Sequence, residues 1–592
     1  MSIKAAGTEP GQRQLNGPQT TGRSYRNLSE PCYALVRDDD QPVPMRDGTR
    51  LLADVYRPDA GGRFPALIAA SPYPRQIQDL GAPMGFIEAG ASDYFVPRGY
   101  VHVVANLRGT GGSEGTFGFF DGQEREDVHD LVEWVAEQPW CDGKVGMIGI
   151  SYFAMTQLEA ATEHPPHLKA IFPVAVTPDL YEAAMPNGLL SSAFVTPFIT
   201  MIGVTAEHGS ELWRGRLLNA VRHVLHAQRV HARFAHMNGE STVAALRLAM
   251  RARHEPHPWD DLWRAIAVEH PLRDEFWDDR SVLDRLGEIE IPVYLGCDWE
   301  NVPLHLPGTF SSLDALSDRA TVRVGLLGKF GLTWPWESLH VEALAWFDHW
   351  LKDRDTGILE GPRIRYWMPG AEAWRGCESW PPPEARIVEF NLGADGLLGS
   401  KASDGARSYL CLGTGLGRPA GAGASDPPTS LEWETRPLEA DLDLVGDVEL
   451  RLEATSTAID TAWIATVQDV APDGEVTDVT QGWLRASLRE VDEAASRPGA
   501  PVLPCRRAQT VPIGERVTYR VPLVPNARRF AAGHRIRLVL TSDDQPETAP
   551  AIMGFRHAPV GTSSLNTVHA ESRLLLSAIP TADSDLRSAQ SA

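Results

Sequence analysis

A serine stands at the junction between an apolar run and a helical pattern, and this junction is the feature that most constrains the fold. Val145–Ile150 reads VGMIGI, Ser151 follows directly, and Met155–Thr162 has a helical pattern. A nucleophile elbow needs small residues such as Gly149 near the serine, because a strained turn lifts the hydroxyl out of the sheet while strand and helix pass closely. The pattern predicts that Ser151 is a nucleophile.

The motif departs from the strict Gly-x-Ser-x-Gly form, since Phe153 stands where the last glycine belongs and Ala154 follows it. An alternative is that Ser151 merely caps the next helix, a position that serine favours. The preceding sequence supports the nucleophile. A strand-like run at Val101–Ala105 and a helical pattern at Glu124–Gln138 lead into the apolar run, which predicts a βαβ unit and a parallel sheet.

The whole pattern predicts an α/β-hydrolase core with an inserted helical cap and a C-terminal all-β jelly-roll sandwich. Helical patterns rich in Trp, Leu, Ala, His and Arg interrupt the α/β pattern, and short alternating runs with Gly- and Pro-rich turns follow it. We expect a flexible tail at 1–32, core at 33–176 and 288–355, cap at 177–287 and sandwich at 356–592. The expected cap helices include Leu212–Phe234 and Val243–Arg253.

Composition limits the possible partners. The 592 residues include 55 Lys and Arg against 78 Asp and Glu, a net charge of −23 at pH 7. Nucleic acids and anionic membranes need clustered basic residues, so we expect neither as a partner. The six cysteines form no CxxC pair and no apolar stretch has the length of a membrane span. We expect a cytoplasmic protein, monomeric or homodimeric, with no metal or cofactor.

The sequence around the elbow is specific enough to resemble one family. Residues 105–149, from ANLRGTGGSEG to KVGMIG, and ISYFAMTQ at 150–157 closely resemble the CocE/NonD hydrolases. These cocaine esterase-like enzymes are related to X-prolyl dipeptidyl peptidases and α-amino acid ester hydrolases. MRDGTRLLADVYRP at 45–58 and FAAGHRIRL at 530–538 are similar to the opening hairpin and the C-terminal sandwich of that family. The resemblance runs from residue 33 almost to the end and implies a serine hydrolase.

Two donors for an oxyanion hole follow from the elbow and the resemblance. The first is the backbone N–H of Tyr152, the residue after the nucleophile. The second, in this family, is a tyrosine hydroxyl in a motif resembling NPY. Ser71–Pro72–Tyr73 matches that motif, so Tyr73 is the candidate. Such donors stabilise the negative charge that develops on the carbonyl oxygen during acyl transfer. The alternative for Tyr73 is a rim aromatic in a proline-rich turn.

The acid and the base are missing from their usual places. The family takes its acid from a segment like GGWYD and its base from one like GPWSH. The matching segments of this chain, LGCDWEN and GKFGL, place Asn301 and Leu332 at those two positions. Asp298 or Glu300 could supply the acid from the same loop, and we take Asp298.

For the base, His340 at the start of the helical pattern Leu339–Lys352 is the first choice, and His305 in PLHLPGT is the second. A histidine on a helix face is more often a packed residue than a catalyst, so each assignment has an ordinary alternative. The choice decides whether the chain has a working triad.

Three classes of function stay open. The first is a hydrolase of an ester or amide bond in a small molecule or short peptide, acting through an acyl-Ser151 intermediate. The second is a repurposed fold, an acyltransferase or cyclase that works without the usual triad. The third is a binding protein that has lost catalysis. Aromatic and apolar residues in the expected cap favour an apolar or aromatic acyl group.

Overall fold

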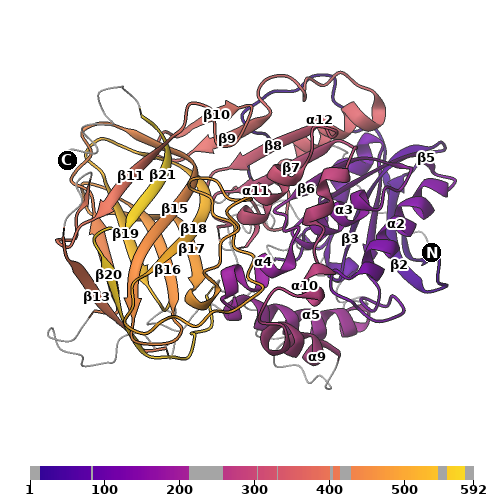
Figure 1. The fold of residues 1–592 in the computed structure, drawn as a ribbon. Coiled ribbons are helices and arrows are strands. Elements are labelled where there is room, and N and C mark those ends of the chain that lie inside the picture. Colours follow the sequence, from indigo (N-terminus) through magenta and orange to yellow (C-terminus); the bar gives the residue numbers. More distant parts are fainter. Residues whose placement is uncertain are drawn as a thin grey trace.

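The computed structural model describes residues 14–81, 85–212, 224, 258–302, 304–329, 331–399, 404–413, 428–544 and 556–580. This part of the chain forms an α/β region followed by an antiparallel β region (Figure 1), which confirms the predicted fold class. Apart from Leu212 and Val224, the expected cap helices Leu212–Phe234 and Val243–Arg253 lie outside the described residues.

The α/β region is built on a mixed sheet. Among the described residues, ten strands follow the order β1-β2-β4-β3-β5-β6-β7-β8-β9-β10. They are β1 (Leu35–Pro44), β2 (Arg50–Pro58), β3 (Phe64–Ser71), β4 (Val101–Asn106), β5 (Cys141–Ile150), β6 (Leu168–Val174), β7 (Val293–Asp298), β8 (Val322–Leu327), β9 (Ile364–Met368) and β10 (Ala373–Cys377). The strands from β4 to β9 pair in parallel. The carboxyl ends of β5, β6 and β7 therefore meet at one edge of the sheet.

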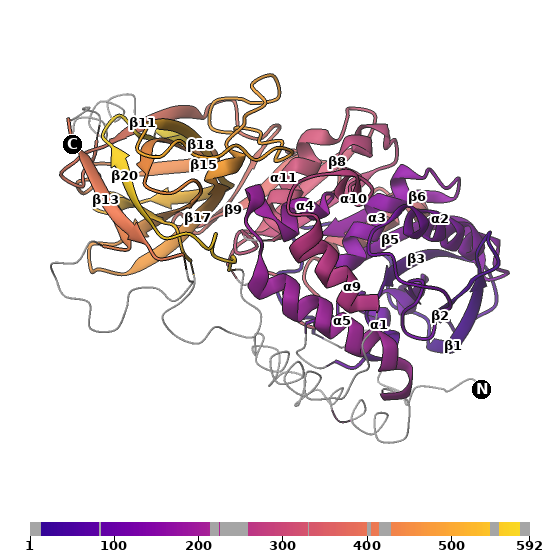
Figure 2. The ribbon, with the colours of Figure 1, turned by 60° about the horizontal axis from the view of Figure 1, so that its bottom comes forward.

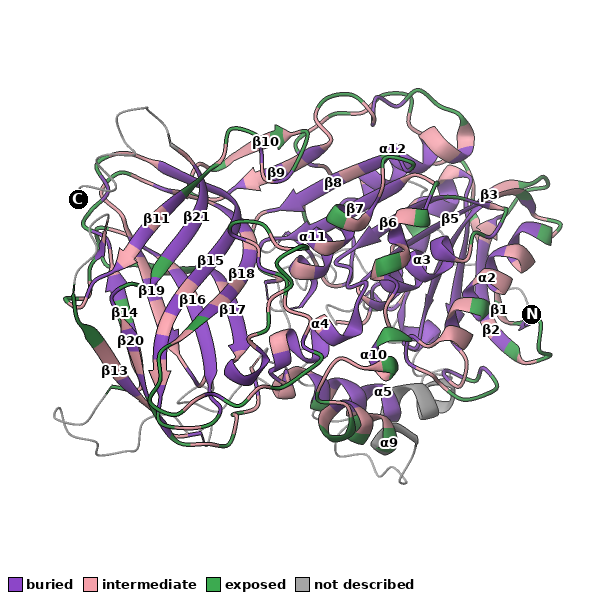
Figure 3. Cartoon of the chain, in the orientation of Figure 1, coloured by how far each residue is buried: buried purple, intermediate pink, exposed green. Residues whose placement is uncertain are grey.

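Helices cover both faces of β5. A side chain added at Gly146 would meet Phe347 of α12 (His340–Lys352), whereas one added at Gly149 would meet Phe153 of α3 (Tyr152–Thr162). Positions an odd number of residues apart on a strand face opposite ways, so these two helices lie on opposite sides of the sheet. This explains why Val145–Ile150 is buried throughout (Figure 3) and reads as a continuous apolar run.

The remaining helices of the core and the insertion after β6 complete the α/β region. They are α1 (Ser92–Phe95), α2 (Gly122–Glu137), α4 (Leu180–Ala184), α5 (Ser192–Leu212), α9 (Pro258–Arg264), α10 (Glu275–Asp278) and α11 (His305–Ala315). Figure 2 shows α5 and α9 side by side, and the indole N–H of Trp263 donates to Thr196 at 3.1 Å. Within the described ranges, no helix is both long enough and apolar enough to cross a bilayer.

The C-terminal region is an antiparallel β sandwich with a core of its own. Its described strands are β11 (Arg386–Leu392), β12 (Leu398–Gly399), β13 (Ala406–Cys411), β14 (Ser430–Glu434), β15 (Leu442–Ser456), β16 (Ala462–Val470), β17 (Val476–Arg485), β18 (Val517–Phe530), β19 (Arg535–Thr541), β20 (Ser564–His569) and β21 (Arg573–Pro580). They follow the order β12-β11-β21-β15-β18-β17-β16-β19-β14, with β20 bridging β13 and β15. The long strands β15 and β18 pair along most of their length and hold the sandwich together.

The N-terminal segment differs from the flexible tail that we predicted, because residues 14–32 lie against the core. Three of its backbone N–H groups donate to buried carboxylates: Asn16 to Glu337 at 2.7 Å, Thr21 to Glu342 at 2.9 Å and Ser29 to Asp348 at 2.6 Å. A buried carboxylate needs donors, and this polar segment supplies them. The segment is polar, as a disordered tail would be, yet its backbone N–H groups are needed by buried carboxylates of the core.

We expect Asp348→Asn to lower the free energy of unfolding by about 2 kcal/mol or more. Asp348 is fully buried and accepts the Ser29 N–H, the Ser29 hydroxyl at 2.6 Å and the Tyr100 hydroxyl at 2.7 Å. An asparagine at this position would replace one accepting oxygen with an NH₂ group, which would face the N–H or O–H donors of Ser29 and Tyr100 and leave them without an acceptor.

The matched control is Asp355→Asn, which removes an exposed ion pair between Asp355 and Arg26 of the same segment. It should change the unfolding midpoint little, because exposed pairs contribute little. Chemical denaturation of both variants checks this. Equal losses would contradict the buried anchor.

Candidate active site

The turn at Ser151 has the backbone of a nucleophile elbow. Ser151 follows β5 and precedes α3, with φ 60° and ψ −121°, in a region that side-chain-bearing residues rarely adopt. Its N–H donates to Val174 O of β6 at 3.0 Å, and its carbonyl accepts Ala154 N–H at 2.8 Å and Met155 N–H at 3.0 Å. The sheet and the first helical turn thus hold the strained conformation and raise the hydroxyl at the sheet edge.

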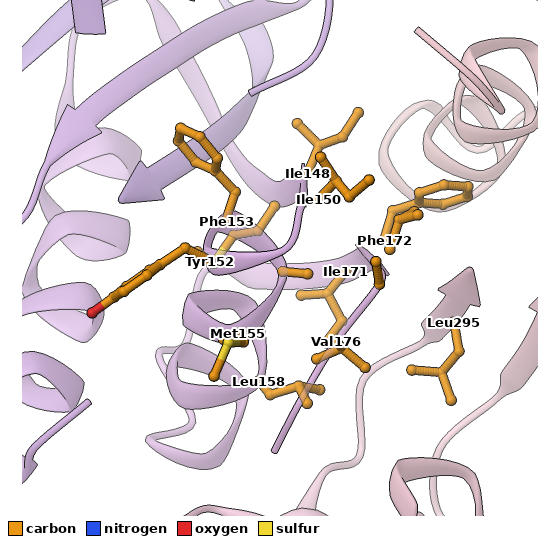
Figure 4. Close-up of a cluster of buried hydrophobic side chains, with 14 of the residues drawn as sticks. Ile148, Ile150, Tyr152, Phe153, Met155, Leu158, Ile171, Phe172, Val176 and Leu295 are labelled. Atoms are coloured by element: carbon orange, nitrogen blue, oxygen red, sulfur yellow. The ribbon is translucent and has the colours of Figure 1, made fainter. Parts of the chain in front are cut away.

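The small residues of the motif have separate reasons. Gly149 has φ +144°, and a Cβ there would lie 2.3 Å from the Cβ of Phe153, so only glycine fits. Phe153, which stands where the last glycine of the motif belongs, and Ala154 after it are both fully buried inside α3. Apolar side chains of β5 and α3 pack around the turn (Figure 4), and the rings of Phe153 and Tyr152 leave the start of α3 in different directions. The departure at Phe153 is therefore compatible with an elbow.

The imidazole that lies against Ser151 belongs to His305. Its Nε2 is 3.2 Å from Ser151 Oγ, and its Nδ1 is 3.0 Å from Thr177 Oγ1. The Thr177 hydroxyl itself donates to Leu304 O at 3.2 Å, so its oxygen is left to accept the Nδ1 proton. This network assigns the Nδ1–H tautomer and leaves the Nε2 lone pair facing the serine hydroxyl. His305 is the second choice of the sequence analysis.

The surroundings keep this imidazole neutral. Burial lowers the pKa of His305 to about 3, because an imidazolium loses its hydration in an apolar site. Within the described ranges, His305 forms no hydrogen bond with a carboxylate, and its side-chain partners are Ser151 and Thr177. A base of this kind is unprotonated at neutral pH but is weaker than an imidazole paired with a carboxylate.

His340, the first choice for the base, has other partners. Its Nε2 accepts the Ala91 N–H at 3.0 Å, and its Nδ1 lies 3.1 Å from the carbonyl of Ser338. The ring packs against Trp336 at 4.9 Å and is fully buried. A neutral imidazole has one lone pair, and the Ala91 N–H occupies that of His340. His340 is therefore not available as the base for Ser151, contrary to our first choice.

Asp298 is likewise engaged away from the serine. At the end of β7, its Oδ1 accepts the Asn301 side-chain amide at 2.7 Å and its Oδ2 accepts Leu332 N–H at 3.2 Å. Burial raises its pKa to about 6, and the hydrogen bond from Asn301 opposes this shift. Asp298 thus lies beside Leu332, the position where the resemblance places a histidine. The alternative acid Glu300 lies 3.5 Å from Lys329.

The predicted oxyanion donors lie at the serine. Burial raises the pKa of Tyr73 well above its ordinary value, Glu88 adds to this, and a hydrogen bond with the Ser151 side chain opposes it. The ring of Tyr73 is 6.0 Å from that of Tyr152. As the first residue of α3, Tyr152 has a backbone N–H with no acceptor inside the helix. Both groups can donate to an oxygen bound at Ser151.

An apolar cavity with an empty volume of about 500 Å³ opens at the serine. Tyr73, Ser151, Thr177 and His305 contribute polar atoms. Apolar residues of the loop before α2, of α3, of α4 and of α5, together with Ile266 and Leu304, form the rest. Among the described residues that line it, no side chain is a carboxylate, lysine or arginine. The site therefore suits a neutral, apolar group.

The family model described as X-Pro dipeptidyl-peptidase (S15 family) matches residues 47–330, and that of the X-Pro dipeptidyl-peptidase C-terminal non-catalytic domain matches residues 357–566. The cocaine esterase of Rhodococcus sp. (strain MB1 Bresler) is 28% identical over 553 residues, which cover 85% of this chain and 90% of the esterase.

Solved structures give the same fold. A CocE/NonD family hydrolase from Staphylococcus aureus superposes with a TM-score of 0.71 at 21% identity, covering 92% of this chain and 94% of that one. An α-amino acid ester hydrolase superposes with a TM-score of 0.67 at 18% identity, covering 96% and 100%. At these identities the similarity concerns the fold alone.

Proposed function

Because the chain belongs to the CocE/NonD hydrolases of the X-Pro dipeptidyl-peptidase (S15) family, we propose that it is an esterase for small esters with a neutral, apolar acyl group. The observation that carries this proposal is the contact of 3.2 Å between His305 Nε2 and Ser151 Oγ at the mouth of an apolar cavity. A serine hydroxyl needs a base within about 2.6–3.2 Å.

The proposed reaction has two steps. The acyl group enters the cavity, His305 Nε2 takes the proton of Ser151 Oγ, and Oγ attacks the carbonyl carbon. The Tyr73 hydroxyl and the Tyr152 N–H donate to the resulting oxyanion. His305 then returns the proton to the alcohol that leaves, and the acyl-serine forms. Water, deprotonated by the same imidazole, releases the acid and restores the serine.

Thr177 occupies the place that a carboxylate has in an ordinary triad. Its oxygen accepts the Nδ1 proton at 3.0 Å and fixes the ring orientation, but it carries no charge to stabilise an imidazolium. The proton that His305 takes from the serine therefore leaves it readily for the departing alcohol. A base of this strength suits esters, because alkoxides depart with less help than the amine of an amide.

The charge of the cavity separates the esterase from the peptidase alternative. A dipeptidyl-peptidase has to hold the positively charged amino terminus of its substrate, which calls for a carboxylate. The described residues that line the cavity offer none. The non-catalytic binding protein is separated from the esterase by the experiments below.

We expect a fluorophosphonate probe to label the native protein and not Ser151→Ala. His305→Ala should lower kcat/KM for p-nitrophenyl butyrate about a thousandfold or more, because the serine loses its base. His340→Gln keeps an acceptor for Ala91 and should stay within about tenfold of native activity. Thermal unfolding verifies that each variant is folded. Native activity in His305→Ala would remove this base, and no labelling of the native protein would favour a binding protein.

The pH profile tests the uncharged partner of the base. The folded-state pKa of His305 is about 3, so the base is neutral above that pH. We expect kcat/KM for a neutral ester to stay nearly constant down to about pH 5. Thr177→Asp should raise the pKa of His305 and move the acid limb toward neutral pH, while Thr177→Val should lower kcat without moving it there. An acid limb near pH 6.5 in the native enzyme, the ordinary imidazole value, would contradict the assignment.

Tyr73→Phe should lower kcat about a hundredfold and leave KM nearly unchanged, since an oxyanion donor acts mainly in the transition state. Steady-state kinetics with p-nitrophenyl butyrate measure both constants. A change confined to KM would make Tyr73 a substrate-binding residue instead.

A further inference from the structure

Glu124 of α2 is a buried glutamate that connects three parts of the site. Its carboxylate accepts the Tyr152 hydroxyl at 3.0 and 3.1 Å and the Phe120 N–H at 3.0 Å. The rings of Phe120 and Tyr152 stack with centroids 4.1 Å apart, and both line the cavity. Phe119 and Phe120 have φ of 60° and 62°, so this loop is strained and depends on such contacts.

A second buried glutamate faces the first. Glu159 lies seven residues after Tyr152 on α3, which places both on one face of the helix. Only 2% of Glu159 is exposed, and neither of its oxygens has a hydrogen-bond donor in the described structure. Burial, the charge of Glu124 and a side-chain hydrogen bond with Glu124 all raise the pKa of Glu159. Two carboxylates cannot both be charged so close together in an apolar setting.

The charged groups around the pair are otherwise engaged. Asp121 accepts the Glu124 N–H at 3.0 Å, and Asp127 binds Arg108 at 2.6 Å. Arg125 donates to Asp279, and Arg280 donates to the carbonyls of Gly118 and Phe276, while the buried Nε of Arg280 has no partner among the described residues. On the far side of α3, Arg285 pairs with Glu163. No described arginine donates to the oxygens of Glu159, so we assign a proton as the donor between the two glutamates.

We propose that Glu159 is a positioning residue: it keeps a proton, donates it to Glu124, and so holds Tyr152 and the Phe120 loop in their catalytic arrangement. The catalytic part of this inference rests on the proposed function. The proton bridges one acid and one carboxylate, and Glu124 keeps its remaining capacity for the Tyr152 hydroxyl and the Phe120 N–H. Loss of the proton would set two charges against each other and release both contacts.

The pKa values agree with this geometry. Burial raises the pKa of Glu124 to about 8, against 4.5 for an ordinary glutamate, and burial followed by the charge of Glu124 raises that of Glu159 further. The folded state thus keeps a proton that the unfolded state has lost. The stabilisation is complete below the unfolded pKa of 4.5 and declines as the pH rises toward about 8.

The test compares Glu159→Gln with Glu159→Leu across pH 6 to 10. In the native protein, the thermal midpoint should fall as the pH rises from 6 toward about 8, where only the unfolded state has lost the proton, and kcat for p-nitrophenyl butyrate should fall above about pH 8, where the folded state loses it. Glu159→Gln supplies a permanent N–H donor, so both declines should vanish and kcat at pH 9 should exceed the native value at least threefold. Glu159→Leu has similar bulk and no donor, so kcat at pH 7 should fall about tenfold.

A decline of the thermal midpoint between pH 6 and about 8 that persists unchanged in Glu159→Gln would overturn the proposal. The thermal midpoint needs no substrate, so it tests the shared proton even if the native protein shows no esterase activity. Failure of the proposed function and failure of the shared proton are therefore distinguishable. Equal kinetics in the Gln and Leu variants would likewise remove the positioning role.

Discussion

The left-handed backbone of Ser151 is the constraint on which the site depends. A residue with a side chain in this conformation costs on the order of 1–3 kcal/mol, so it persists only where its surroundings enforce it. Here β6 accepts its N–H, α3 begins on its carbonyl, and the glycine at 149 lets the helix approach the strand. The same turn exposes the Tyr152 N–H. The proposed nucleophile and oxyanion donor are therefore products of one backbone conformation.

The loop after β7 joins Asp298 to His305, the base that we propose. Asp298 remains at the strand end, but it caps its own loop and binds the backbone of Leu332. Seven residues later, the first turn of α11 presents His305 to the serine from the same edge of the sheet. Parallel strands bring their carboxyl ends together, so any of the loops there can supply a base. What is lost is the charge of the carboxylate partner, which Thr177 does not replace.

The C-terminal sandwich supports the cavity from outside. The insertion that carries α4 and α5 packs against it: Leu488 abuts Gly188, which lies between these two helices, and Arg273 N donates to Cys505 O at 3.1 Å. An ion pair of 2.8 Å between Arg506 and Asp278 of α10 also joins the C-terminal region to this insertion. Cavity walls formed by an insertion are more easily displaced than a sheet edge, because fewer strands hold them. Contact with a rigid sandwich limits that movement.

Local sequence determined the elements whose signals are short-range. The apolar run before Ser151, the glycine at 149 and the helical spacing after it specify an elbow wherever they occur, because backbone sterics and periodicity act within a few residues. The sandwich followed from its short alternating runs and turns, whereas the oxyanion role that we propose for Tyr73 came from the family resemblance. Tertiary structure decided the rest. His305 and His340 are each the first residue of a helix, α11 and α12, so the sequence does not distinguish them. Only the packing of the two helices directs one ring to the serine and the other to Ala91. The segment 14–32 likewise reads as a tail until buried carboxylates more than 300 residues away require its N–H groups. Contacts between distant parts of a chain depend on where whole elements pack, which no local pattern encodes.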